Sequence, residues 1–219
     1  MRIDSHHSFS ERYPLGHLES ILKRNRFDAG ILVSEACWPA QEFVKAVIVR
    51  TGTLDPRALD EYQRQPKFRG ICYELAAGEV PAGFAELEQR AISLDLAAGL
   101  ELVPRIAESF PRLRIALDHL GAPFSGDWAQ RLAAAAQYSN VFCKLSGLTR
   151  IAPSPVPYVR HALAVFGPGR LMFGSDWPNS LPEYSWKAAL AAFTQAIGAQ
   201  TVEIREELLG GTAARFYAL

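Results

Sequence analysis

The chain has 219 residues, 49% of them hydrophobic, and its 23 basic side chains balance 23 acidic ones. This length and apolar content suffice for one substantial core, so we expect a single domain over residues 1–219. The balanced charge, without runs of either sign, argues against a nucleic-acid-binding or membrane-surface protein and favours a small-molecule partner. No leader-like segment opens the chain, and no apolar run approaches the roughly 18 residues of a membrane span. We therefore expect a cytoplasmic protein with reduced cysteines.

Short apolar runs alternate with stretches of helical spacing along the chain. Strands are expected near residues 2, 30, 48, 70, 93, 115, 142 and 172. Helices are expected over residues 11–26, 55–66, 84–91, 100–110, 128–138, 157–166, 184–197 and 203–217. Only a short connection, with at most a brief helix from Pro39, separates the second and third strands, so this crossover is compressed.

Eight strand-helix units at intervals of roughly 20 to 28 residues predict an α/β fold, a (β/α)8 TIM barrel. A doubly wound open sheet is the alternative, but it needs a phosphate-cradling glycine loop after an early strand, and the sequence has none.

Polar residues follow three of the expected strands. His6 ends the first strand, His119 the sixth, and Asp176 the eighth. Because the carboxyl ends of parallel strands meet at one mouth of a barrel, we expect these side chains to lie together. Each of them could instead have a structural role. An aspartate at a strand end can cap the next helix, and a histidine in a strand can be a core residue whose ring nitrogens are hydrogen-bonded.

Histidine and carboxylate groups in this arrangement suit hydrolysis, by either of two routes. One divalent metal such as zinc, held by His6, His119 and Asp176, would lower the pKa of a bound water while Asp176 takes its proton. With no metal, Asp176 can still act as a general base, and a histidine or lysine can stabilise an oxyanion. We therefore predict His6, His119 and Asp176 as catalytic residues.

Four further residues are predicted to bind the substrate. Lys144 lies in the seventh strand and Arg150 just after it, and both could face an anionic group. Tyr73 of the fourth strand and Trp177, next to Asp176, complete the set. Lys144 could instead extend along the surface into solvent. Three acidic residues near strand ends are weaker site candidates: Glu35, Glu74 and Asp95.

Four segments, residues 3–6, 117–123, 172–178 and 211–217, resemble the amidohydrolase-related (amidohydrolase 2) family. Within it, they are most similar to the lactonase-like branch, and the likeness runs nearly end to end. The resemblance implies a distorted TIM barrel that hydrolyses a small carboxylated lactone, ester or amide. It further implies that Asp176 activates the water and that His119 binds metal or substrate.

Two departures from the family pattern affect the expected metal. The family opens with Asp-x-His-x-His, but Ser8 holds the place of the second histidine, and His7 faces the other side of the strand. Residues 71–74 stand where the branch often carries Arg-His. These departures predict weak or absent metal. They also keep two alternatives open, a metal-dependent decarboxylase of the same superfamily and a barrel without catalysis that has a binding role.

Overall fold

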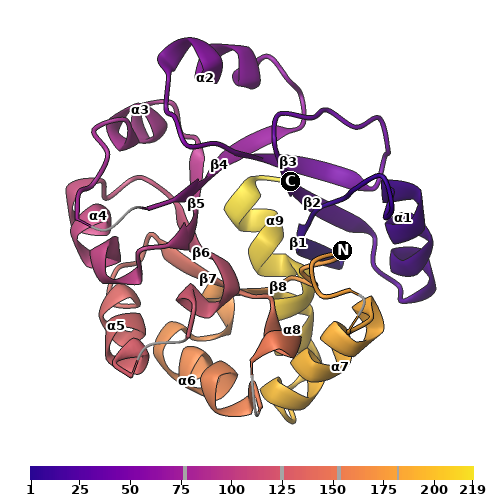
Figure 1. Cartoon of the computed structure of the whole chain (residues 1–219). Coiled ribbons are helices and arrows are strands. Elements are labelled where there is room, and N and C mark those ends of the chain that lie inside the picture. Colours follow the sequence, from indigo (N-terminus) through magenta and orange to yellow (C-terminus); the bar gives the residue numbers. More distant parts are fainter. Residues whose placement is uncertain (76–77, 124–125, 152–153, 182) are drawn as a thin grey trace.

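Eight parallel strands form a sheet that curls into a nearly closed barrel in the computed structural model (Figure 1). The structure describes residues 1–75, 78–123, 126–151, 154–181 and 183–219. The strands pair in chain order: β1 (Ile3–His7), β2 (Ala29–Ser34), β3 (Val44–Arg50), β4 (Phe68–Glu74), β5 (Ser93–Ala98), β6 (Ile115–Leu117), β7 (Val141–Leu145) and β8 (Leu171–Phe173). The chain just after β8 reaches β1, where the amide of Asp176 donates to the carbonyl of His6 at 2.9 Å. The predicted TIM barrel is confirmed.

Helices cover the outside of this barrel in Figure 1. They are α1 (Leu15–Arg24), α2 (Pro56–Gln63), α3 (Phe84–Gln89), α4 (Val103–Ser109), α5 (Trp128–Ala135), α6 (Val156–Phe166) and α7 (Trp186–Ile197). Asp55 caps α2 by accepting from the amide of Arg57, and Pro56 takes the first helical position. No helix in the described part of the chain is long and apolar enough to cross a membrane.

The connection between β2 and β3 is compressed, as predicted, but it contains no helix. Residues 35–43 form only turns and extended chain, so the short helix expected from Pro39 is wrong. The reason is reach: the six residues of β2 span about 20 Å, whereas nine helical residues would return only about 14 Å. The ammonium group of Lys67 holds this segment by donating to the carbonyls of Pro39 and Gln41, at 2.7 and 2.8 Å.

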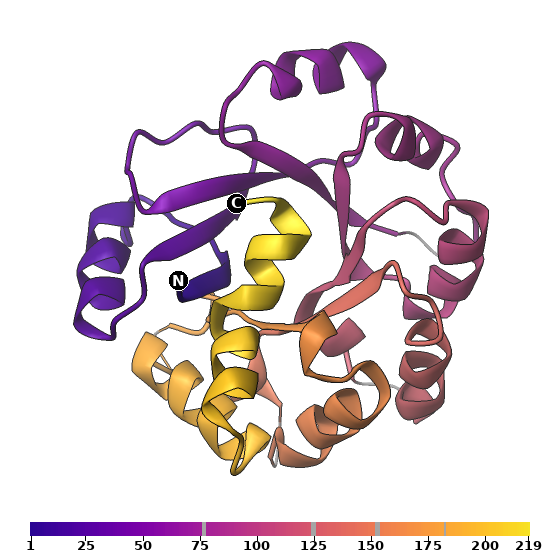
Figure 2. The same cartoon turned by 180° about the vertical axis from the view of Figure 1, so that it is seen from behind.

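The C-terminal segment packs inside the barrel at the amino ends of the strands (Figure 2). The single helix expected over residues 203–217 is in fact α8 (Val202–Glu206), a π-helical turn (Glu207–Gly211) and α9 (Thr212–Tyr217). The helix breaks because the start of the chain lies against Gly210, where any Cβ would clash with the carbonyl oxygen of Met1. Phe216 and Tyr217 of α9 pack on inward-facing strand residues such as Ile31. This helix therefore plugs the barrel.

Candidate active site

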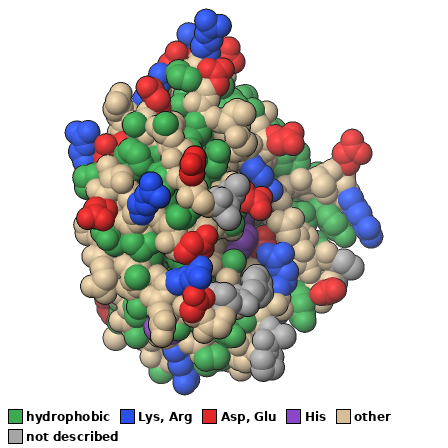
Figure 3. Space-filling model, turned by 60° about the vertical axis from the view of Figure 1, so that its left-hand side comes forward, with side chains coloured by type: hydrophobic (Ala, Val, Ile, Leu, Met, Phe, Trp, Pro, Cys, Tyr) green, Lys and Arg blue, Asp and Glu red, His purple; other side chains and the backbone are tan. Residues whose placement is uncertain are grey.

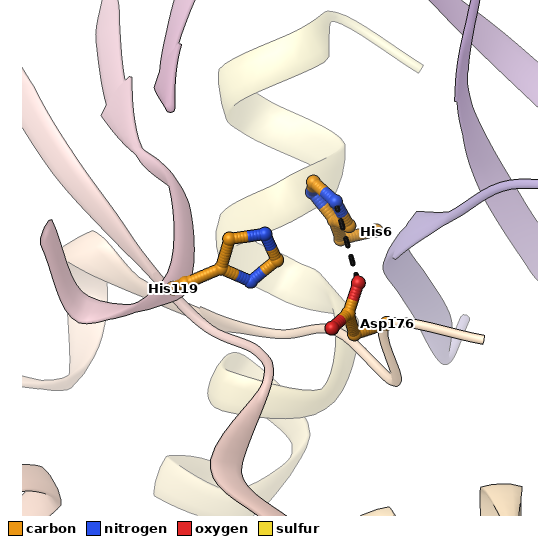
Figure 4. Close-up of side chains that lie close together, drawn as sticks. All are labelled: His6, His119 and Asp176. Carbon is orange, nitrogen blue, oxygen red and sulfur yellow. Dashed lines mark ion pairs between the residues drawn. The ribbon is translucent and has the colours of Figure 1, made fainter. Parts of the chain in front are cut away.

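The structure brings His6, His119 and Asp176 together at the carboxyl end of the strands (Figure 4). One ligand atom from each residue lies within 4.8 Å of the other two. Nε2 of His6 is 4.0 Å from Oδ1 of Asp176, and the rings of His6 and His119 meet edge to face with centroids 4.6 Å apart. The three strand ends thus converge as the sequence predicted.

His119 and Asp176 both lie in backbone conformations that residues other than glycine rarely adopt. Their φ angles are +50° and +58°. Such strain costs of order 1–3 kcal/mol and occurs mainly where function requires it. Asp4 braces the turn before Asp176, because its carboxylate accepts from the amide of Ser175 and from Nε1 of Trp186, each at 2.8 Å. Asp4 of the first motif is therefore structural, and the turn it fixes carries the site carboxylate.

Each site histidine has a polar partner on its Nδ1 side. The hydroxyl of Ser146 lies 2.9 Å from Nδ1 of His119, and the nearest carboxylate oxygen of Asp118 lies 3.3 Å from Nδ1 of His6. Burial, with a contribution from His6, lowers the pKa of His119 to about 4, so this imidazole is neutral at pH 7.

Because these partners lie at the Nδ1 atoms, the Nε2 atoms of the two histidines remain available to a ligand. A carboxylate behind a histidine is the usual arrangement around protein-bound metals. His6, His119 and Asp176 could therefore hold one divalent metal, and three protein ligands plus water make a known catalytic zinc set.

An ion cluster lies directly beneath the site, inside the barrel. Nζ of Lys144 is 2.5 Å from Asp95 and 3.0 Å from Asp118, and the hydroxyl of Tyr217 donates to Asp95. Burial opposes the charge of Lys144, but Asp118 and Asp95 outweigh it and raise the pKa of Lys144 well above its usual value. The side chain of Lys144 has no exposed surface. The alternative in which it extends into solvent is therefore wrong, because two buried carboxylates compensate its charge.

Arg150 reaches the site from the turn after β7. Its Nη2 atom is 2.6 Å from Oδ2 of Asp176, and the side chain is 46% exposed. Asn179 donates to the other carboxylate oxygen of Asp176, at 2.9 Å. Sequence reasoning missed Asn179, although its position three residues after Asp176 in the same turn could have indicated it. Asp176 thus has partners for both oxygens, while Arg150 remains partly accessible.

Two residues predicted to bind substrate, Tyr73 and Trp177, pack against other side chains. Tyr73 packs edge-on against Phe84 of α3, with ring centroids 5.6 Å apart, because strand alternation turns its neighbour Cys72 into the barrel and Tyr73 outward. Trp177 is 2% exposed. The same alternation turns His7 away from the site, against Gly30 and Phe43.

One cavity borders the site, and a second cavity adjoins the first. One of about 240 Å³ is lined by Ala97, His119, Ala122, Pro123, Ser146, Gly147, Arg150 and Ile151. The other, of about 490 Å³, is lined by Glu35, Arg50, Thr51, Gly52, Cys72, Glu74 and Ala97. They share Ala97, and in the described residues Arg50 has no ion-pair partner. Sequence reasoning missed Arg50, whose place at the end of β3 was the available signal. Figure 3 shows a surface hollow with a histidine between acidic and basic side chains.

Comparisons with known proteins agree with this geometry. The family model described as Amidohydrolase matches residues 96–219. An uncharacterised protein, y4mH, of Sinorhizobium fredii is 31% identical over 73% of this chain and 64% of its own length. An L-fucono-1,5-lactonase of Burkholderia ambifaria is 33% identical over 81% of this chain and 71% of its own length. The chain therefore spans about two thirds of the length of these relatives.

A solved structure shows the same fold. The crystal structure of an amidohydrolase from Burkholderia multivorans with bound zinc superposes with a TM-score of 0.83 at 25% identity. The superposition covers 100% of this chain and 99% of that one.

Proposed function

Because the chain belongs to the amidohydrolase family, we propose that this enzyme hydrolyses a small lactone and that Asp176 takes the proton of the attacking water. The observation that carries the proposal is the convergence of Asp176 with His6 and His119, whose ligand atoms all lie within 4.8 Å of one another. An accessible cavity opens next to them, lined by His119 and Arg150.

The proposed reaction needs one nucleophile and one proton transfer. The water oxygen attacks the lactone carbonyl carbon while Asp176 accepts a water proton, and the ring C–O bond then breaks as that proton passes to the leaving oxygen. Arg150, at the cavity, and neutral His119 can stabilise the negative charge that develops on the carbonyl oxygen. A divalent metal held by His6, His119 and Asp176 would supply Lewis acidity, lowering the pKa of the water. Zinc is the metal we propose.

The charges around the cavities support two kinds of lactone. Arg50 and Arg150 offer cationic groups to a carboxylate on the substrate, which favours the carboxylated lactone that the sequence predicts. Glu35 and Glu74 lie in the same larger cavity and suit hydroxyl groups as hydrogen-bond acceptors. The relative named L-fucono-1,5-lactonase points to the latter. A sugar lactone and a carboxylated lactone are therefore the first two substrates to test.

The test measures proton release from a panel of both lactone types, with and without added zinc. Asp176→Asn keeps the size and hydrogen bonding of the side chain but removes the proton acceptor, so turnover should fall by roughly 10² to 10⁴. Asp55→Asn is the control, because Asp55 is an exposed helix cap and asparagine caps equally well. If Asp176→Asn melts at a lower temperature yet hydrolyses the lactone at the original rate, Asp176 has a structural role and the proposal fails. Release of CO₂ from a carboxylated substrate would instead identify a decarboxylase.

A further inference from the structure

The side chains of Lys144, Asp95, Asp118 and Tyr217 form a cluster that is sealed inside the barrel. Each of them is at most 1% exposed. One ammonium lies between two carboxylates, and the phenol of the plugging helix α9 donates to the deeper carboxylate, Asp95. No substrate can touch Lys144 in this position.

Such a cluster needs an explanation other than stability. A buried ion pair seldom stabilises a fold more than well-packed apolar side chains of the same volume would. At one end the cluster contacts the site, because Nδ1 of His6 is 3.3 Å both from Oδ1 of Asp118 and from Nζ of Lys144. At the other end, the hydroxyl of Tyr217 on α9 donates to Asp95. The cluster therefore connects the plug of the barrel to one candidate ligand residue.

The two neighbours of His6 impose opposite proton positions. Asp118, a carboxylate, can only accept, which requires the imidazole proton on Nδ1, whereas the ammonium of Lys144 can only donate, which requires a lone pair there. Lys144 lies closer to its carboxylate partners, at 2.5 and 3.0 Å, than to His6 at 3.3 Å. Nζ of Lys144 donates to Asp95 and also lies within hydrogen-bond distance of Nδ1 of His6, whereas the buried Oδ1 of Asp118 has no hydrogen bond to any described residue. A proton on Nδ1 of His6 would give this carboxylate oxygen the donor that it lacks.

We propose that Lys144 is a positioning residue for His6: anchored by Asp95, it holds the Asp118 carboxylate against Nδ1 of His6, so that Nε2 presents its lone pair beside Asp176. This proposal rests on the proposed function in one respect: it requires that His6 is part of the active site. It replaces a substrate-binding role for Lys144. It also gives Asp95 and Tyr217 a purpose at the site, although neither touches it.

The main test is the double variant Lys144→Met with Asp95→Asn, which removes one positive and one negative charge and so keeps the net charge of the cluster. The matched control is Lys23→Met with Glu19→Gln, which removes an exposed ion pair of 2.7 Å on α1. The first readout is the ¹⁵N spectrum of the imidazole of His6, assigned with His6→Gln. The second is the affinity for Co²⁺ added alone.

We expect the wild type and the control to carry the proton of His6 on Nδ1. In the double variant, the imidazole proton of His6 should shift towards Nε2. The double variant should also bind Co²⁺ about 10-fold to 100-fold more weakly, which is the usual effect of losing a group that orients a metal ligand. A lower melting temperature with unchanged tautomer and unchanged Co²⁺ affinity would show a purely structural cluster and overturn the proposal. Neither readout needs a substrate, so failure of the lactonase proposal would be seen separately, in the proton-release assay.

If the double variant does not fold, Tyr217→Phe replaces it. That variant removes only the hydroxyl that anchors Asp95, and it should change the tautomer and the Co²⁺ affinity in the same direction by a smaller factor. A folded Tyr217→Phe protein with the wild-type spectrum and wild-type Co²⁺ affinity would equally overturn the proposal.

Discussion

The hydroxyl of Tyr217 donates to both carboxylate oxygens of Asp95, at 3.0 and 2.9 Å, in the centre of the barrel. Removing this hydroxyl in Tyr217→Phe leaves a buried carboxylate short of a donor, so the free energy of unfolding should fall by about 1–3 kcal/mol. Urea denaturation measures the loss. Tyr158→Phe is the control, since Tyr158 packs on Trp128 and its hydroxyl bonds to no described residue. Equal losses in the two variants would contradict this prediction.

The residues at the strand ends were the part of the candidate site that could be predicted from the sequence. His6, His119 and Asp176 each follow a short apolar run, and parallel strands bring such positions to one mouth whatever the details of packing. The fold followed from the same regular alternation of strands and helices. Local spacing was sufficient because each of these inferences depends on only a few neighbouring residues.

The interior of the barrel could not be predicted in this way. Lys144 and Asp95 are 49 positions apart and Tyr217 and Asp95 are 122 apart, so no local pattern links them. Asp95 was therefore predicted only as a weak site candidate, and Tyr217 only as the last residue of the C-terminal helix. The orientation of Tyr73 was missed for a related reason, because strand register decides which of Cys72 and Tyr73 faces inward.

The three cysteines should differ in reactivity. Burial raises the pKa of Cys72 to about 12 and raises that of Cys143 as well, whereas Cys37 is partly exposed. Because the thiolate is the reactive form, a maleimide at about pH 8 should label Cys37 in the native protein and leave the other two thiols free. Peptide mass spectrometry identifies the labelled sites, and unfolded protein provides the reference in which all three react. Labelling of Cys143 as fast as Cys37 would disagree with the structure.

Restoring the family pattern at Ser8 should strengthen metal binding. Ser8 follows His7 at the end of β1, so its side chain alternates back to the side of His6. In Ser8→His, a fourth ligand joins His6, His119 and Asp176, and the affinity for Zn²⁺ should rise at least about tenfold, or about 1.4 kcal/mol. Competition with a chromogenic chelator measures this affinity. Ser10→His adds an imidazole beyond the strand and should leave the affinity unchanged; if Ser8→His behaves like it, residue 8 does not face the metal.

His7 should make the stability of the protein fall in acid. Its imidazole is buried, and burial lowers its pKa to about 4, against about 6.5 in the unfolded chain. Between these values the unfolded state binds the proton and the folded state does not, so the stabilisation is complete above about pH 6.5 and is lost as the pH falls towards 4.

Between about pH 7.5 and pH 4.5, His7 should therefore account for about 2 to 3 kcal/mol of lost unfolding free energy. His7→Gln cannot take up this proton, so its stability should decline less over the same interval, even if it is lower at both ends. Urea denaturation of the wild type, of His7→Gln and of the exposed helix variant His17→Gln measures the three declines. His17→Gln should match the wild type. If His7→Gln also loses as much stability on acidification as the wild type, then His7 already carries its proton in the folded state at pH 4.5.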